Sequence, residues 1–225
     1  MTDQKVVSSN VGPTTPVYRG ATQQTPTIAP TSVTTGTAKF AQIPLMEYSN
    51  ARPNVRTGDL LLCSGRWLFS RLIESYTKSI FSHVGLFVWW HERLLVFESV
   101  EHSGVRMSPA SFYVSNYAFG GKAYNGDLYI GKVSPDLADA ALDKMLGFGG
   151  DELCRPYGWK QLWAALLLLT PLSQKANQSY VCSEFVGALL AHAGLAKFTP
   201  KGQVLSPEDI AADPRVRAFA KIKLV

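Results

Sequence analysis

Two hydrophobic runs in the middle of the chain, separated by a short polar stretch, predict a β-hairpin. The first run is HVGLFVWW at 83–90, and the second is LLVFESV at 94–100. Both are rich in β-branched and aromatic residues, and they flank the polar residues HER. Shorter runs of the same kind, at 60–63, at 126–133 and in the C-terminal AKIKLV, predict three further strands.

Hydrophobic residues also recur at helical spacing in several segments between and after these runs. Helices are predicted at 66–79, at 180–194 and at 206–213, and a further helix is predicted to begin at Ser134–Pro135. Serine followed by proline is typical of a helix start, and Gly194 is typical of a helix end. Short strands together with segregated helices predict an α+β fold.

The first 45 residues differ in composition from the rest of the chain. They are rich in Thr, Pro, Ser and Gln and contain few large hydrophobic side chains. Such a segment buries too little surface to offset its ordering entropy. We therefore predict an extended or disordered arm at 1–45 and one folded domain at 46–225.

Neither a signal peptide nor a transmembrane segment is predicted. The chain does not begin with a hydrophobic run, and its longest one, WAALLLL at 163–169, is too short to cross a bilayer. We interpret this run as a buried helix, with contact to a lipid surface as the alternative.

The balance of charge is mildly basic, with 22 Lys and Arg against 17 Asp and Glu, a net charge of +5 and a pI of about 9.1. This favours an anionic partner such as a cell-wall polymer or a membrane surface. No basic cluster is interleaved with aromatic residues, so nucleic-acid binding is not predicted. The sequence has neither a C-x-x-C nor an H-E-x-x-H motif, and no metal or other cofactor is predicted.

Three cysteines are candidates for nucleophilic chemistry. Cys182 lies in the first turn of a predicted helix, where free backbone N–H groups and the helix dipole favour a thiolate. A small buried core residue is an equally good interpretation of this position alone. Cys63 ends a hydrophobic strand and is interpreted as packing, and Cys154 lies in a polar loop and is interpreted as incidental.

A reactive thiol needs a base, and His83 is the best candidate because it begins a strongly hydrophobic strand. Glu98 interrupts the next strand. If the hairpin loop has an even number of residues, two residues pair when their residue numbers add up to 183. Glu98 then shares a sheet face with His83. A loop with an odd number of residues would place Glu101 on that face instead. A two-residue loop HE suits a tight turn poorly, so the four-residue loop WHER is favoured, and with it Glu98. A solvated carboxylate on an edge strand is the alternative for Glu98. The other histidines are predicted at turns or at a helix end: His91, His102 and His192.

Several short motifs occur in a specific order: TGDLLL, SHVG, FES, RPYG and YVCSEFVGALL. Together they resemble the circularly permuted branch of the NlpC-type papain-like cysteine hydrolases, and above all the YiiX/YebB-like group. The resemblance covers about residues 55–212. It implies a permuted papain-like fold in which a small antiparallel sheet packs against helices.

The same resemblance implies a catalytic site. Cys182 would be the nucleophile, His83 the base and Glu98 the group that orients it, while Tyr180 and Tyr157 would line the substrate site. The implied reaction is acyl transfer through a thioester, without a metal or other cofactor. Backbone N–H groups at the start of the cysteine helix would hold the oxyanion.

Three functions remain open at this stage. The leading one is a cysteine peptidase or amidase that cleaves peptidoglycan stem peptides. The second is a lipid-directed thiol acyltransferase or deacylase, suggested by the hydrophobic stretch 159–172 and by the Trp89–Trp90 pair. The third is a structural assembly protein that retains the fold. An arm outside the family's domain, without a predicted signal peptide, would suit a component of a virion or of a secretion-delivered assembly; a cytoplasmic protein is the alternative, and the compartment is left open.

Overall fold

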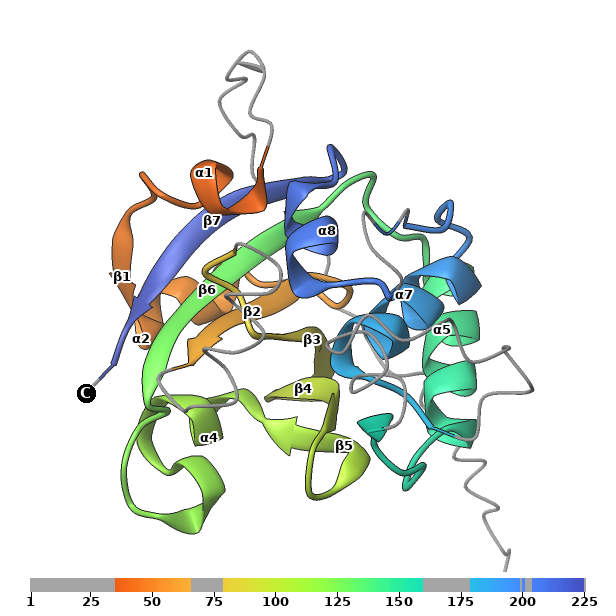
Figure 1. The fold of residues 1–225 in the computed structure, drawn as a ribbon, viewed down its shortest axis with the longest axis horizontal. Helices are drawn as coiled ribbons and strands as arrows, with labels where there is room; N and C mark the ends of the chain where they lie inside the picture. Colours follow the sequence, from red (N-terminus) through yellow and green to blue (C-terminus); the bar gives the residue numbers. More distant parts are fainter. Residues whose placement is uncertain (1–34, 66–78, 160–178, 199, 201–203, 225) are drawn as a thin grey trace, which may run out of the picture.

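The computed structural model describes residues 35–65, 79–159, 179–198, 200 and 204–224. These residues form an α+β fold in which helices pack against a twisted seven-stranded sheet (Figure 1). The strand order is β1-β7-β6-β2-β3-β4-β5. The predicted α+β class is therefore confirmed. The sheet is not purely antiparallel as expected, because β1 joins the edge parallel to β7.

The strands have the following bounds: β1 Leu45–Glu47, β2 Leu60–Gly65, β3 His83–Trp90, β4 Arg93–Val100, β5 Gly104–Pro109, β6 Gly126–Val133 and β7 Val216–Lys223. The helices are α1 Gly36–Lys39, α2 Tyr48–Ala51, η1 Arg52–Asn54, α4 Ala110–Ser115, η2 Tyr117–Phe119, α5 Asp139–Asp151, α7 Cys182–His192 and α8 Pro207–Ala212. The bounds of β3 and β6 match the prediction, whereas β1 and β5 were not predicted.

The β3–β4 hairpin decides which side chains face one another at its open end. Leu86 pairs with Phe97, and Trp90 pairs with Arg93, so paired positions sum to 183 as predicted. The predicted four-residue loop is wrong: the turn has two residues, and His91 adopts a left-handed φ of 50° within it. Because both loop lengths are even, the pairing of the two strands is the same as predicted, and Glu98 lies on the same sheet face as His83.

The α5 helix begins later than predicted. Ser134 does not cap it, because the Ser134 N–H donates to the carbonyl of Arg215 and continues the pairing of β6 with the C-terminal segment. The helix begins only at Asp139, after the N-cap Ala138. The other serine-proline start is confirmed, since the Ser206 hydroxyl accepts from the N–H of Asp209 and caps α8.

The α7 helix begins at Cys182, with Val181 as its N-cap. It therefore begins two residues after the predicted start at residue 180. The Val181 N–H donates to the Glu184 carboxylate at 3.4 Å, so an acidic side chain in the first turn satisfies the backbone there. At the other end, the helix ends at His192, and Gly194, the residue typical of a helix end, follows with a left-handed φ of 85°.

Two hydrophobic cores lie on opposite faces of the sheet. On one face α5, α7 and α8 pack against alternate residues of β2, β3 and β4, and Figure 1 shows α5 and α7 side by side there. On the other face α2 and α4 cover a second cluster, which includes Tyr113 and Val96. Because strand side chains alternate between faces, each central strand contributes to both cores.

The chain already packs against the domain before residue 46, where the folded part was predicted to begin. The buried carboxylate of Glu208 on α8 accepts from the backbone of Gly36 at 2.6 Å and from the Thr37 hydroxyl at 3.2 Å. Phe40, just after α1, is 1% exposed. Contacts to α8 therefore fix the segment 36–40.

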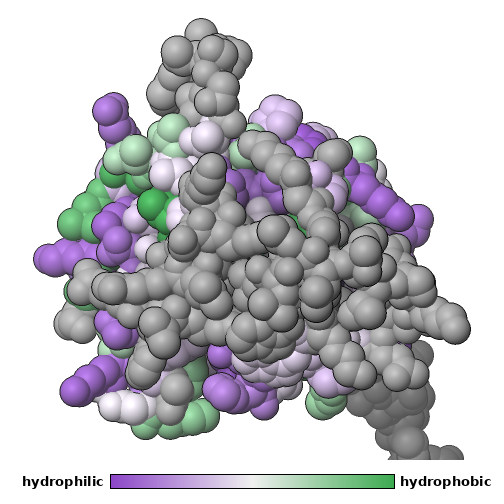
Figure 2. Space-filling model, in the orientation of Figure 1, coloured by the Kyte–Doolittle hydropathy of each residue, from purple (hydrophilic) through white to green (hydrophobic). Residues whose placement is uncertain are grey.

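Three predicted features lie outside the described residues: most of the arm, nearly all of the helix at 66–79, and the hydrophobic run at 163–169. Among the helices that the structure describes, none combines the length and hydrophobicity that spanning a bilayer requires. In the view of Figure 2 the described surface is mainly polar, with a small hydrophobic area over β1, where Leu45 is 59% exposed.

Candidate active site

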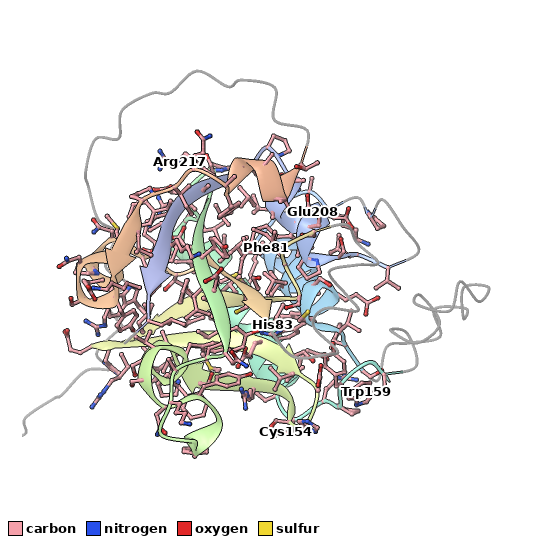
Figure 3. All side chains as sticks on the ribbon, turned by 60° about the vertical axis from the view of Figure 1, so that its left-hand side comes forward. Phe81, His83, Cys154, Trp159, Glu208 and Arg217 are labelled. Carbon is pink, nitrogen blue, oxygen red and sulfur yellow. The ribbon has the colours of Figure 1, made fainter. Side chains whose placement is uncertain are left out.

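A histidine–glutamate pair lies at the end of the sheet where β3 begins. Nε2 of His83 lies 2.8 Å from Oε2 of Glu98. Glu98 is fully buried, whereas the His83 side chain is 17% exposed. Figure 3 shows His83 near the middle of the domain. The hairpin register brings the two residues together, since a shift by one position would turn Glu98 to the other face.

The Cys182 side chain reaches the same histidine from a different element. Cys182 is the first residue of α7, which packs against β3 and β4. It is 4% exposed, and its side chain interacts with that of His83. Glu98 engages Nε2 of His83, which leaves Nδ1 as the ring nitrogen available to the sulfur. The structure thus brings three of the predicted site residues into one chain of contacts.

These contacts change the protonation of the imidazole. Burial lowers the pKa of His83, but hydrogen bonds to Cys182 and Glu98 and their negative charges outweigh it and raise that pKa to about 10. His83 is therefore protonated at neutral pH. A cationic imidazole next to a cysteine favours the thiolate, which is the nucleophilic form of sulfur.

Tyr157 and Tyr180, the two predicted substrate-site residues, lie side by side. They form an isolated parallel bridge, in which the Tyr180 N–H donates to the Pro156 carbonyl and the Gly158 N–H donates to the Tyr180 carbonyl at 2.9 Å. The Ser99 hydroxyl donates to the same carbonyl at 2.8 Å. Burial and the nearby Cys182 raise the pKa of the Tyr157 hydroxyl well above its usual value. The RPYG segment is thereby held against the start of the cysteine helix.

A glycine makes room for this segment at the edge of the sheet. The Val105 N–H donates to the Arg155 carbonyl, and the Cys154 N–H donates to the Val105 carbonyl, both at about 3 Å. Gly104 has a φ of 63°, and a Cβ on it would lie 1.9 Å from the Arg155 oxygen. Only glycine combines this backbone conformation with such a close approach.

The other cysteines have different surroundings. Cys63 is fully buried, as expected for a residue that packs in the core. It also lies directly opposite His83 in the β2–β3 register, which was not predicted from the sequence. Burial, Glu98 and Cys182 raise the pKa of the Cys63 thiol well above its usual value. Cys154 is exposed and well separated from His83 in Figure 3. Neither of them lies at the start of a helix, as Cys182 does.

Sequence reasoning also missed the residues that surround Glu98 from β5 and α4. Arg106, Ser108 and Tyr113 all donate hydrogen bonds to its carboxylate. The alternation of polar and hydrophobic residues at 104–109 could have predicted a strand. Its register with β4 depends on the turn at 101–103, which the alternation does not specify.

Comparison with known proteins finds a similar fold among solved structures. No family model and no curated protein sequence matches the chain. Among solved structures, the crystal structure of the metalloprotein YiiX from Escherichia coli O157:H7 superposes with a TM-score of 0.55 at 18% sequence identity. The match covers 75% of this chain and 98% of YiiX.

The chain has a YiiX-like fold. At 18% identity this likeness concerns the fold alone, and it agrees with the group that the motif order resembles. YiiX is described as a metalloprotein; in the described part of this chain, no three His, Cys, Asp or Glu side chains are grouped so that they could hold a metal ion.

The contacts from Cys182 through His83 to Glu98 make the free energy of unfolding depend on pH. The folded-state pKa of His83, about 10, lies above its usual value of 6.5. The stabilisation from its protonated form is therefore complete below about pH 6.5 and is lost as the pH rises through about 10. We expect the free energy of unfolding of the wild type to exceed that of His83→Gln most at about pH 6, and this difference to shrink steadily towards pH 10. Urea unfolding at several pH values measures it, and a difference that does not change with pH would contradict the raised pKa.

Proposed function

We propose that the protein is a cysteine hydrolase of the permuted papain-like, NlpC type, with Cys182 as nucleophile, His83 as base and Glu98 as the group that orients His83. The observation that carries this proposal is the continuous contact from Cys182 through His83 to Glu98, built from a helix start and two paired strands. A nucleophile, a base and an orienting carboxylate in hydrogen-bond contact are the requirements of this chemistry, whatever their order in the chain.

The proposed reaction cleaves an amide in two stages. The Cys182 sulfur attacks the carbonyl carbon, and the protonated His83 gives its proton to the leaving nitrogen as the C–N bond breaks. A thioester and a free amine result. His83 then takes a proton from water, the resulting hydroxide attacks the thioester carbon, and the C–S bond breaks to leave a carboxylic acid and the original sulfur–imidazole pair.

Backbone N–H groups at the first turn of α7 are suited to stabilise the oxyanion. The first N–H groups of a helix have no partner within the helix, and they point along the positive end of its dipole. Cys182 is the first residue of α7, so its sulfur and these donors lie close together. Tyr157 and Tyr180 would line the adjoining substrate site, which agrees with their bridge and their position before α7.

The proposed substrate is a stem peptide of peptidoglycan. A net charge of +5 favours binding to an anionic wall polymer. Purified sacculi incubated with the wild-type protein should release soluble muropeptides with new amino and carboxyl ends, and Cys182→Ala should release none. Mass spectrometry of the soluble fraction identifies the bond that is cut. Equal release by both proteins, or release by neither, would count against this substrate.

The lipid-directed alternative has lost part of its support. Of the tryptophan pair, Trp89 donates its indole N–H to the Val55 carbonyl at 2.7 Å and stacks with Arg52, while only Trp90 is largely exposed, at 59%. An acyl-thioester presented in liposomes distinguishes this alternative from the peptide substrate, since Cys182-dependent turnover of the thioester without action on sacculi would favour it. Absence of Cys182-dependent turnover in both assays would favour a structural role.

A further inference from the structure

Four donors surround the Glu98 carboxylate and divide its two oxygens between them. Oε2 accepts from Nε2 of His83 at 2.8 Å and from the Tyr113 hydroxyl. Oε1 accepts from Nε of Arg106 at 3.0 Å and from the Ser108 hydroxyl at 3.1 Å. With both oxygens engaged, the carboxylate cannot rotate without breaking contacts. The three donors other than His83 therefore fix the orientation in which the carboxylate faces the histidine.

Arg106 reaches Glu98 from the neighbouring strand. The β4–β5 register places Arg106 directly opposite Glu98, and Ser108 lies on the same face two residues further along. The Arg106 side chain is 28% exposed, whereas Glu98 has no exposure. A guanidinium at the rim can thus bring its charge to a fully buried carboxylate while part of it remains hydrated, which limits the cost of burying a charge.

Only two of the described groups that face Glu98 can carry a positive charge. The titratable groups around it come from five strands and helices: His83 on β3, Cys63 on β2, Arg106 on β5, Tyr113 on α4 and Tyr117 in η2. Burial raises the pKa of Glu98, but the hydrogen bond and charge of His83 and the charge of Arg106 outweigh it and hold that pKa below its usual value.

His83 and Arg106 differ in whether they keep their positive charge throughout the proposed reaction. In the proposed reaction His83 gives its proton to the leaving group, so its positive charge is absent in the thioester intermediate. The guanidinium of Arg106 stays charged throughout, and its pKa is raised further, because the Glu98 charge outweighs partial burial. Arg106 is therefore the cation that can keep a buried Glu98 ionised at the stage where His83 is neutral.

We propose that Arg106 is a positioning residue of this reaction, which rests on the proposed function: it keeps Glu98 ionised, with Oε2 directed at His83, throughout the cycle. An ionised Glu98 continues to accept the Nε2 proton of the neutral imidazole. Nδ1 is then the unprotonated nitrogen on the sulfur side, where it takes a proton from the hydrolytic water. A Glu98 that had taken up a proton would no longer hold this tautomer.

The titration of Glu98 tests this role directly. In protein labelled with ¹³C at glutamate, the carboxyl carbon of Glu98 is identified by its loss in Glu98→Gln, and its shift is followed with pH. We expect Arg106→Met to raise its midpoint by about one pH unit or more. Arg106→Lys, which keeps the charge, and Ser108→Ala, which removes a neutral donor from the same oxygen, should stay close to the wild type.

Activity on sacculi provides the second measurement. Muropeptide release by Arg106→Met should fall about tenfold at one pH unit below the Glu98 midpoint measured for that variant and recover in part at higher pH, because Glu98 is ionised there. Arg106→Lys should restore most of the activity. If Arg106→Met does not fold, Arg106→Gln is used, since it keeps a polar side chain at this partly exposed position.

Several outcomes would overturn the proposal. A folded Arg106→Met or Arg106→Gln with an unmoved Glu98 midpoint would refute it, as would an equal shift in Ser108→Ala, which would assign the effect to hydrogen bonding and not to charge. The failure of the proposed function is distinguishable: a wild type without Cys182-dependent release refutes the hydrolase. Release by the wild type together with an unmoved midpoint refutes only the role of Arg106.

Discussion

His83→Gln is expected to lower Cys182-dependent turnover on the order of 10³-fold. His83 holds the proton that the leaving group needs, and its pKa of about 10 keeps that proton on the imidazole at neutral pH. Glutamine preserves a polar side chain of similar reach but cannot shuttle a proton. The same variant should slow alkylation of Cys182 by iodoacetamide near pH 7, because the sulfur loses its cationic partner. Mass spectrometry of labelled peptides measures this rate at each cysteine.

His192→Gln is the matched control for this prediction. His192 lies on α7, the helix that begins with Cys182, but it is exposed and stacks on the Phe148 ring at a centroid distance of 3.8 Å. Its loss should leave both turnover and labelling near the wild-type values. The site assignment would be wrong if Cys154, which is exposed, or Cys63, which is buried, reacted ahead of Cys182 in the wild type.

Gly104→Ala is expected to destabilise the protein by about 3 kcal/mol or more and to remove most of its activity. The added Cβ would lie 1.9 Å from the Arg155 carbonyl oxygen, and the backbone has a φ of 63°. Relief of this clash requires the Arg155 segment to move away from β5. The backbone contacts of Tyr157 with Tyr180, two residues further along, would then be disturbed next to α7. Urea unfolding and the sacculus assay measure the two effects.

Gly121→Ala separates the clash from the backbone strain. Gly121 has a similar φ of 66°, but a Cβ on it would have no neighbour within 4 Å. It should therefore cost only about 1 kcal/mol and leave turnover unchanged. Equal losses of stability in the two variants would mean that backbone strain alone matters at Gly104. The close approach of the Arg155 segment would then not be what holds the site together.

The sequence predicted best those features that depend on interactions between residues close together in the chain. Strand periodicity predicted β3 and β6 with their bounds, and the serine-proline pattern predicted α8. The parity argument for Glu98 held although the loop length was wrong, because only an odd change of loop length alters the face. The serine-proline pattern failed at Ser134, where a hydrogen bond to Arg215, far along the chain, competes with a helix start.

The sequence by itself determined the α+β class, the hairpin register that places His83 and Glu98 on one face, and the helix that begins close to Cys182. These follow from hydrophobic periodicity and from capping and turn residues, which act over a few positions. The tertiary structure alone decided that Cys182 contacts His83, that Arg106, Ser108 and Tyr113 enclose Glu98, and that the RPYG segment lies against Tyr180. Such contacts join residues far apart in the chain. They depend on how strands and helices pack together, which no local pattern encodes.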